Sequence, residues 1–340
     1  MRALEARAIP QSLIHTGQHY DPLLSEVFFR DLGLPAPDVD LGVGSGSHAG
    51  QTAKLLVELE SALERAEPRL VVTYGDVNST LAAALVAAKL QQPSAHVEAG
   101  LRSFDRSMPE EINRVVTDAL ADLLFTTSPE ARTNLIREGV PDGRIHFVGN
   151  PMIDTLVANR ARFDGKGIRA RLDIPGRYGV VTLHRPANVD EPATVARLVE
   201  ALTAAAARVP LVIPLHPRGR AALEAAGLAR APGVSLKDPL GYVDFLSLVS
   251  GAALVITDSG GIQEETTILG VPCLTVRPNT ERPITISHGT NRLVTIEALA
   301  AEVGTVLANG IPVPPQPPPL WDGRAGERIG DVVVAWLGAA

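Results

Sequence analysis

The sequence predicts an α/β protein built from two Rossmann-like, doubly wound parallel sheets. Short β-branched apolar runs alternate with longer Ala- and Leu-rich segments of helical period, which is the pattern of a parallel sheet covered by helices on both faces. The length of 340 residues also suffices for two domains of about 150 residues, each with its own core. We therefore expect two domains of this kind facing a cleft.

The expected strands fall into two series. Those of the first series are Ser12–His15, Leu70–Tyr74, Ser94–Val97, Leu123–Thr126 and Ile145–Val148. Those of the second are Gly179–Leu183, Leu211–Leu215, Val234–Leu236, Ala253–Thr257, Cys273–Val276 and Arg292–Val294. Between the series, Gly149-Asn150-Pro151 breaks the pattern, and Met152–Phe163 is expected to be a helix. We place one domain over residues 1–155 and the other over 156–322.

Both ends of the chain depart from this alternation. Arg2–Arg7 looks like the tail of a helix, whereas a doubly wound domain opens with a strand, so we expect the first domain to lack its first strand. Ile311–Leu320 is rich in proline, which favours an extended connector. Residues 323–340 follow, and Arg324–Trp336 is expected to form a closing helix.

Composition limits the classes of partner. A net charge of -7 argues against a general nucleic-acid or membrane-surface binder. Cys273 is the only cysteine, which excludes an internal disulfide and a cysteine-based zinc cluster. The sequence has no apolar run of about 20 residues, no H-E-x-x-H and no Asp-x-Asp after a strand. We expect a cytoplasmic protein that uses no metal and no cofactor.

Three carboxylates are expected at one edge of the first sheet. Asp76 follows the strand Leu70–Tyr74, and Glu98 follows Ser94–Val97, so both lie at the carboxyl ends of parallel strands, where α/β sheets bind ligands. Glu110 comes after Pro109 and would begin a helix whose dipole stabilises its charge. We expect these groups to act as acid and base.

A structural interpretation of the same residues is equally consistent with their spacing. Asp76 and Asn78 would then only cap the helix that begins near Ser79. Glu98 and Glu110 would form salt bridges with nearby arginines, namely Arg102 and Arg114.

The second half carries a candidate phosphate site. Ser259, Gly260 and Gly261 follow an apolar strand and open a helix, where small residues and backbone N–H groups favour an anion. Glu265, further along that helix, is expected to reach ribose hydroxyls; the alternative is a solvated helix carboxylate. His184-Arg185 and His216-Pro-Arg218 follow two other strands and are expected to neutralise a diphosphate, although a lone histidine is more often structural.

These residues together carry a family resemblance. The chain resembles the non-hydrolysing UDP-N-acetylglucosamine 2-epimerases (UDP-GlcNAc 2-epimerases) along nearly its whole length. The segments that carry the resemblance are His15-Thr-Gly-Gln-His-Tyr-Asp21, Gly75-Asp-Val-Asn-Ser-Thr80, His96-Val-Glu-Ala-Gly-Leu-Arg102, Met108-Pro-Glu-Glu-Ile-Asn-Arg114, His184-Arg185, Asp258-Ser-Gly-Gly-Ile-Gln-Glu-Glu265, Thr280-Glu-Arg-Pro283 and Gly289-Thr-Asn-Arg-Leu-Val294.

The resemblance implies a fold and a reaction. The fold is the two-domain architecture of many nucleotide-sugar glycosyltransferases, called GT-B, with a UDP-binding second domain. The reaction is reversible inversion at C2 of UDP-GlcNAc, giving UDP-ManNAc, through elimination of UDP to a 2-acetamidoglucal and its re-addition. Such enzymes are metal-independent, serve cell-surface polysaccharide biosynthesis and are commonly homodimers. The resemblance also implies that such an isomerase binds a UDP-sugar and neither nucleic acid nor a membrane.

The resemblance also assigns roles to residues. Asp76, Glu98 and Glu110 are the acid/base candidates, and His184 stabilises the departing diphosphate. The expected contacts of the UDP group are Arg114, His216, Phe245, Ser259, Gly260, Gly261, Glu265 and Arg282, with Phe245 beside the uracil and Glu265 on the ribose. A second, regulatory substrate site is expected at Gln18 and His19.

One departure and four alternatives accompany the resemblance. Family members open with a strand and a Gly-Thr-Arg-Pro-Glu-like turn, and residue 1 here already falls in the following helix, so a mis-assigned start site is the simplest explanation. The alternatives are a UDP-diacetamido-uronic acid 2-epimerase, a hydrolysing epimerase, a glycosyltransferase of the same architecture, and a sugar-nucleotide-binding protein without turnover.

Overall fold

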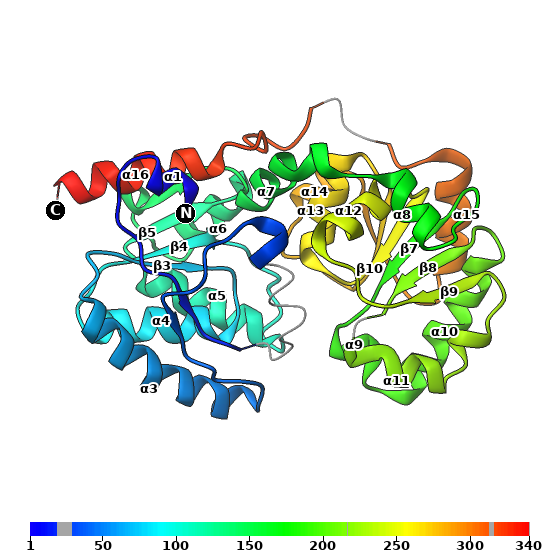
Figure 1. Cartoon of the computed structure of the whole chain (residues 1–340), viewed down its shortest axis with the longest axis horizontal. Coiled ribbons are helices and arrows are strands. Elements are labelled where there is room, and N and C mark those ends of the chain that lie inside the picture. The colour runs from blue at the N-terminus through cyan, green and yellow to red at the C-terminus, as the bar shows by residue number, and fades with distance from the viewer. Residues whose placement is uncertain (19–28, 216, 313–315, 340) are drawn as a thin grey trace. The chain divides into compact units, whose positions relative to one another are not determined.

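The structure, a computed structural model, describes residues 1–18, 29–215, 217–312 and 316–339 (Figure 1). The chain divides into two compact units, Met1–Val157 with Pro319–Ala340, and Ala158–Pro318. Within the described residues, no helix is long and apolar enough to cross a bilayer.

The first unit is organised around short parallel strands. Its strands are β1 (Ile14–His15), β2 (Val39–Asp40), β3 (Val71–Tyr74), β4 (Ser94–Ala99), β5 (Leu123–Thr126) and β6 (Ile145–Phe147). Its helices are α1 (Arg2–Glu5), α3 (His48–Ala66), α4 (Asn78–Lys89), α5 (Pro109–Leu120), α6 (Pro129–Arg137), the 3₁₀ turn η1 (Asp142–Arg144), α7 (Pro151–Asn159), which continues into the second unit, and α16 (Ala325–Ala339).

Two separate sheets form from these strands. The order β3-β4-β5-β6 makes a four-stranded parallel sheet, while β1 and β2 pair only with each other. Among the described residues, β3 is therefore an edge strand of the four-stranded sheet. The strand β2 was not among the expected strands, because Val39–Asp40 is too short to show an alternating pattern.

The closing helix α16 belongs to the first unit. Ile329 and Val333 on α16 pack against a buried cluster that includes Val97 of β4 and Phe125 of β5. On the Ala-rich helix α4, seven residues are buried, which allows close packing against its neighbours α3 and α5. The core of this unit therefore combines residues that are more than 170 positions apart in the sequence.

The second unit is a six-stranded parallel sheet with the order β12-β11-β10-β7-β8-β9. The strands are β7 (Gly179–Thr182), β8 (Leu211–Pro214), β9 (Val234–Lys237), β10 (Leu254–Thr257), β11 (Cys273–Val276) and β12 (Asn291–Val294). The helices and 3₁₀ turns are η2 (Arg160–Arg162), α8 (Gly165–Arg171), α9 (Pro186–Val189), α10 (Pro192–Ala206), α11 (Pro217–Ala225), η3 (Leu228–Arg230), α12 (Tyr242–Ser250), α13 (Gly260–Leu269), α14 (Ile284–Ser287) and α15 (Leu299–Asn309).

This strand order places a topological switch point beside β7. The chain builds β8 and β9 on one side of β7, then returns to build β10, β11 and β12 on the other. Every residue of β8, β10 and β11 is buried, as expected for strands covered on both faces. The expected fold class, α/β with two doubly wound parallel sheets, is confirmed, and each expected strand overlaps an observed one.

Candidate active site

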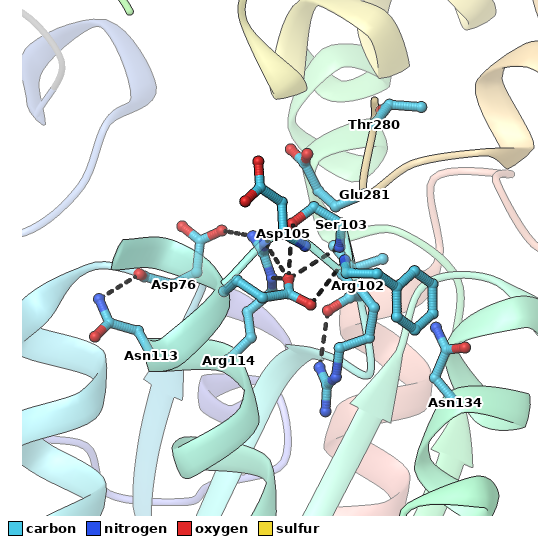
Figure 2. Close-up of polar contacts among 12 residues, drawn as sticks. Asp76, Arg102, Ser103, Asp105, Asn113, Arg114, Asn134, Thr280 and Glu281 are labelled. Atoms are coloured by element: carbon cyan, nitrogen blue, oxygen red, sulfur yellow. Dashed lines mark hydrogen bonds and ion pairs between the residues drawn. The ribbon is translucent and has the colours of Figure 1, made fainter. Parts of the chain in front are cut away.

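Asp76 lies directly beyond the carboxyl end of β3 and is paired with a buried arginine. Arg114 of α5 is 1% exposed, and its Nη1 lies 2.5 Å from Oδ2 of Asp76 (Figure 2). The Asp76 backbone is also held, because its carbonyl accepts a hydrogen bond of 2.8 Å from Asn113 Nδ2. The carboxylate is therefore fixed at this sheet edge by two residues of one helix.

Glu111, which the sequence analysis did not single out, occupies the other side of Arg114. Its Oε2 lies 2.6 Å from Arg114 Nη2, and its two oxygens accept the backbone N–H groups of Ser103 and Phe104, each at 2.9 Å. Burial opposes the charge of this carboxylate, but the Ser103 N–H and the Arg114 guanidinium outweigh it and lower the pKa of Glu111. Glu111 thus ties the 103–104 loop to α5.

Glu98 lies where the backbone of β4 is irregular. The pairing of β4 with β5 shifts its register between Val97 and Ala99, and Glu98 itself has φ 74°. A non-glycine residue in this left-handed region costs about 1–3 kcal/mol and persists only where its surroundings impose it. Strain of this kind concentrates at functional sites, which supports the expectation that Glu98 is one.

The capping part of the structural interpretation is wrong. Helix α4 has Val77 at its N-cap, without a side-chain cap, so neither Asp76 nor Asn78 caps it. Arg102 pairs with Asp118 and Glu138, while Arg114 pairs with Asp76 and Glu111. Glu110 is half-buried on the first turn of α5, directly after Pro109.

The other residues expected in this unit are only partly described. Gln18 is described, and its Oε1 accepts the Ser79 N–H at 2.9 Å, so it contacts the start of α4 close to Asp76. His19 lies outside the described residues, as does His216 of the second unit.

In the second unit, His184 and Asp258 follow the two adjacent strands of the switch point, β7 and β10. His184 Nδ1 lies 3.0 Å from Oδ1 of Asp258, and the His184 side chain is 42% exposed while Asp258 is fully buried. Asp258 also accepts the backbone N–H of Arg185 and the side chain of Asn188. Burial opposes its charge, but His184 and these donors outweigh it and lower the pKa of Asp258. Asp258 therefore orients His184 at the sheet edge.

The start of α13 has the composition of an anion site. Ser259 is the N-cap residue, its side chain makes no capping bond, and Gly260 and Gly261 form the first turn. A side chain at Gly260 would place a Cβ 2.7 Å from Glu281 Oε1, so the Glu281 and Arg282 side chains would have to move to make room for it. The backbone N–H groups and the helix dipole favour a negatively charged ligand at this point.

Buried ion pairs support that first turn. Arg282 pairs through Nε with Glu264 at 3.0 Å and through Nη1 with Glu281. Arg277 Nη2 lies 2.6 Å from the other oxygen of Glu281. Burial opposes the charge of Glu281, but Arg282 and then Arg277 lower its pKa strongly. Arg282 is thus 7% exposed and engaged by two carboxylates, and ligand contact by it stays a prediction.

Glu265 lies on the same helix and is buried, so the alternative of a solvated carboxylate is wrong. It is 3% exposed. Burial is the main cause that raises the pKa of Glu265 to about 8, Glu264 adds to the rise, and a hydrogen bond with Tyr242 opposes it. Tyr242 begins α12, which also carries the half-buried Phe245.

The structure brings together some of the expected residues within each unit. Asp76 and Arg114 are in contact in the first unit, and His184 lies at the switch point beside the strand that leads to Ser259 and Gly260. Residues 1–18, 29–215, 217–312 and 316–339 contain no group of three or more His, Cys, Asp or Glu that could hold a metal ion.

The fold and these sites define the class of the protein: a Rossmann-like α/β protein with polar groups gathered at the carboxyl ends of its parallel strands. Comparison with known proteins narrows the class. The family model for UDP-N-acetylglucosamine 2-epimerase matches residues 2–334. The chain belongs to that family.

Individual relatives agree with the family model. A UDP-N-acetylglucosamine 2-epimerase from Methanocaldococcus jannaschii is 43% identical over 304 residues, covering 86% of this chain and 83% of that protein. A UDP-2,3-diacetamido-2,3-dideoxy-D-glucuronate 2-epimerase from Pseudomonas aeruginosa is 41% identical over 296 residues, covering 86% and 82%. The crystal structure of the M. jannaschii enzyme in complex with UDP-GlcNAc and UDP matches with a TM-score of 0.91 at 40% identity, covering 98% of this chain and 94% of that one.

Proposed function

We propose that this protein is a non-hydrolysing UDP-GlcNAc 2-epimerase, an isomerase that interconverts UDP-GlcNAc and UDP-ManNAc. The observation that carries the proposal is the similarity over 98% of the chain to a solved epimerase that holds UDP-GlcNAc and UDP. The two sites described above supply the chemistry. Carboxylates at the edge of the first sheet serve proton transfer, and the switch point of the second sheet receives the diphosphate.

The first unit would handle the C2 proton. Elimination of UDP requires a base that removes this proton, and re-addition requires an acid that returns one on the opposite face. Asp76, Glu98 and Glu110 are the proposed acid/base groups. The rigid pairing of Asp76 with Arg114 and the strained backbone at Glu98 support their positions, because proton transfer demands fixed geometry.

The second unit would hold the leaving group. His184, oriented by Asp258, would stabilise the departing diphosphate, and Ser259, Gly260 and Gly261 would bind it through the start of α13. We propose Glu265 for the ribose and Phe245 for the uracil. Arg114, Arg282 and His216 are proposed as further contacts of the UDP group.

Assembly and location complete the proposal. We propose that the protein is a homodimer, which light scattering would check, and that it is located in the cytoplasm. We also propose a regulatory substrate site at Gln18 and His19. The contact of Gln18 with the first turn of α4 supports a link between that site and Asp76.

The proposed reaction makes an isotopic prediction. In heavy water, removal and return of the C2 proton must place deuterium at C2 of UDP-ManNAc and, by reversal, at C2 of the UDP-GlcNAc pool. We would incubate UDP-GlcNAc with the protein, without added metal or nicotinamide, and follow C2 by NMR. The absence of deuterium at C2 would overturn the proposal.

A second candidate function differs only in the sugar. The 41% identity to the P. aeruginosa enzyme favours a UDP-diacetamido-uronic acid 2-epimerase as the alternative. The same NMR assay with that nucleotide sugar separates the two, because the true substrate is the one whose C2 exchanges faster at equal concentration.

Glu265→Gln tests the assignment of the nucleotide site. Replacement of the carboxyl group proposed for the ribose hydroxyls by an amide should raise the Kd of UDP roughly 3- to 10-fold, as measured by titration calorimetry. Glu200→Gln, on the exposed face of α10, is the matched control and should bind UDP like the wild type. Unchanged UDP affinity of Glu265→Gln would remove Glu265 from the site.

The same variant should change the pH dependence of stability. The pKa of Glu265 is about 8 in the folded protein against 4.5 for an ordinary glutamate, so the folded state binds more protons between these values. Its contribution to stability therefore falls as the pH rises from about 4.5 to 8. Glu265→Gln should not show this decrease in stability and should be more stable than the wild type at pH 9.

A further inference from the structure

His96 is a fully buried histidine whose two ring nitrogens both face acceptors. It lies in β4, in register with Thr73 of β3 and Leu124 of β5. Nδ1 lies 2.6 Å from Oδ1 of Asp118, and Nε2 lies 2.8 Å from the carbonyl oxygen of Gly75. A carboxylate and a carbonyl accept but do not donate hydrogen bonds, so both nitrogens must carry hydrogen and His96 is an imidazolium.

The surrounding charges balance this buried cation. Asp118 is 1% exposed, and its second oxygen lies 2.7 Å from Nη1 of Arg102. Arg102 in turn donates to both oxygens of Glu138, at 2.8 and 2.6 Å. Two cations and two carboxylates thus form one cluster, and the charge of Glu98 also acts on His96. Burial opposes the charge of the imidazole, but Asp118 and the Gly75 carbonyl outweigh it and raise the pKa of His96.

The cluster holds the backbone beside the first two candidate carboxylates, Asp76 after β3 and Glu98 near the end of β4. The Gly75 carbonyl, held by His96, directly precedes Asp76. The Gly100 N–H, two residues beyond Glu98, is held by Asp118 Oδ2 at 3.0 Å. Gly100 packs so closely on the backbone of α6 that an added Cβ would lie 2.9 Å from the carbonyl carbon of Ala131. The backbone that follows the strained residue Glu98 is therefore fixed at Gly100.

We propose that the His96 imidazolium, with Asp118 beside it, is a positioning group that holds Asp76 and Glu98 in the geometry for proton transfer at C2. This inference rests on the proposed epimerase function. Both ring nitrogens are engaged by the protein, so His96 acts through its neighbours. Without the ring, the Gly75 carbonyl and the Asp118 carboxylate each lose one donor, and the backbone at Glu98 relaxes toward an unstrained conformation. Misplacement of a catalytic group by about 1 Å can cost roughly 100-fold in rate.

His96→Gln is the decisive variant. Glutamine is neutral and its amide cannot replace both ring N–H groups in their positions, so we expect kcat to fall about 10- to 100-fold. The Kd of UDP should stay within about twofold, because the proposed diphosphate site lies in the other unit. The matched control is His146→Gln in β6 of the same sheet, which should retain the kcat of the wild type. A folded His96→Gln protein with wild-type kcat would overturn the proposal.

Two further measurements keep the test independent of folding and of the function. Nitrogen-15 NMR of the wild-type protein should show one histidine with both ring nitrogens protonated at pH 8. The signals of this histidine should be absent from the spectrum of His96→Gln. If that variant does not fold, the same signals should be absent from the spectrum of Asp118→Asn. A neutral His96 at pH 8 would overturn the proposal. Asp118→Asn keeps the shape of the cluster and removes the negative charge of residue 118, so it should also lower kcat. An Asp118→Asn protein with wild-type kcat would contradict the proposal. Absence of C2 exchange by the wild type would instead reject the epimerase function, while the NMR result would still stand.

Discussion

Glu98→Gln should lower kcat by about 10²- to 10⁴-fold, because an amide can neither remove nor return the C2 proton. Glutamine is nearly isosteric with glutamate, so the strained backbone at residue 98 should persist. The rate of deuterium entry at C2, measured by NMR, should fall in parallel with kcat. UDP binding should be unchanged, which separates this loss from damage to the nucleotide site.

The control for this variant is Glu64→Gln on the exposed face of α3, which should match the wild type. A Glu98→Gln protein within about fivefold of wild-type kcat would contradict the prediction. Asp76 and Glu110 would then be the remaining candidates for the acid and the base, and their amide variants would be measured in the same assay.

Arg114→Met should lower the free energy of unfolding of the first unit by about 3–5 kcal/mol. Glu111 is 2% exposed, and the variant leaves its carboxylate, and that of Asp76, without a cation. Both tryptophans, Trp321 and Trp336, belong to the first unit, so their fluorescence during urea denaturation reports this unit.

Arg132→Met is the matched control for this change. Arg132 pairs with Asp142, and both side chains are about half exposed, so its loss should cost less than about 1 kcal/mol. A similarly small loss for Arg114→Met would mean that the Ser103 and Phe104 amides and the Ser103 hydroxyl suffice to stabilise Glu111.

The difference between Arg114→Met and the wild type should also depend on pH. The pKa of Glu111 is lowered in the folded protein, so its stabilising contribution is complete above the ordinary value of 4.5. This contribution is lost as the pH falls through the lowered pKa. The difference in stability between the two proteins should therefore shrink under acidic conditions.

The sequence predicted the sheets well because buried parallel strands are short apolar runs between helical segments. The strand β2 escaped notice, since two residues carry no periodic signal. The roles of Asp258 and Glu111 also went unrecognised, although both lie within segments that carry the family resemblance. Their roles depend on which backbone N–H groups surround them, and that arrangement exists only after folding.

The buried network around His96 shows the same limit. Asp118 lies in the last turn of α5, and nothing in its spacing connects it with His96, 22 residues earlier. The contact arises because α5 packs against β4. The residues at the sheet edge could be predicted, because the end of each strand can be located in the sequence. The residues whose hydrogen bonds hold them in place could not.

The position of α16 has a consequence for biosynthesis. The strands of the first unit are complete by residue 147, yet the helix that covers Val97 and Phe125 begins only at Ala325. At about 5–20 residues per second, synthesis of residues 148–325 takes roughly 9–36 s. The second unit can fold during this interval, while the nascent first unit keeps an apolar sheet face that a chaperone can bind.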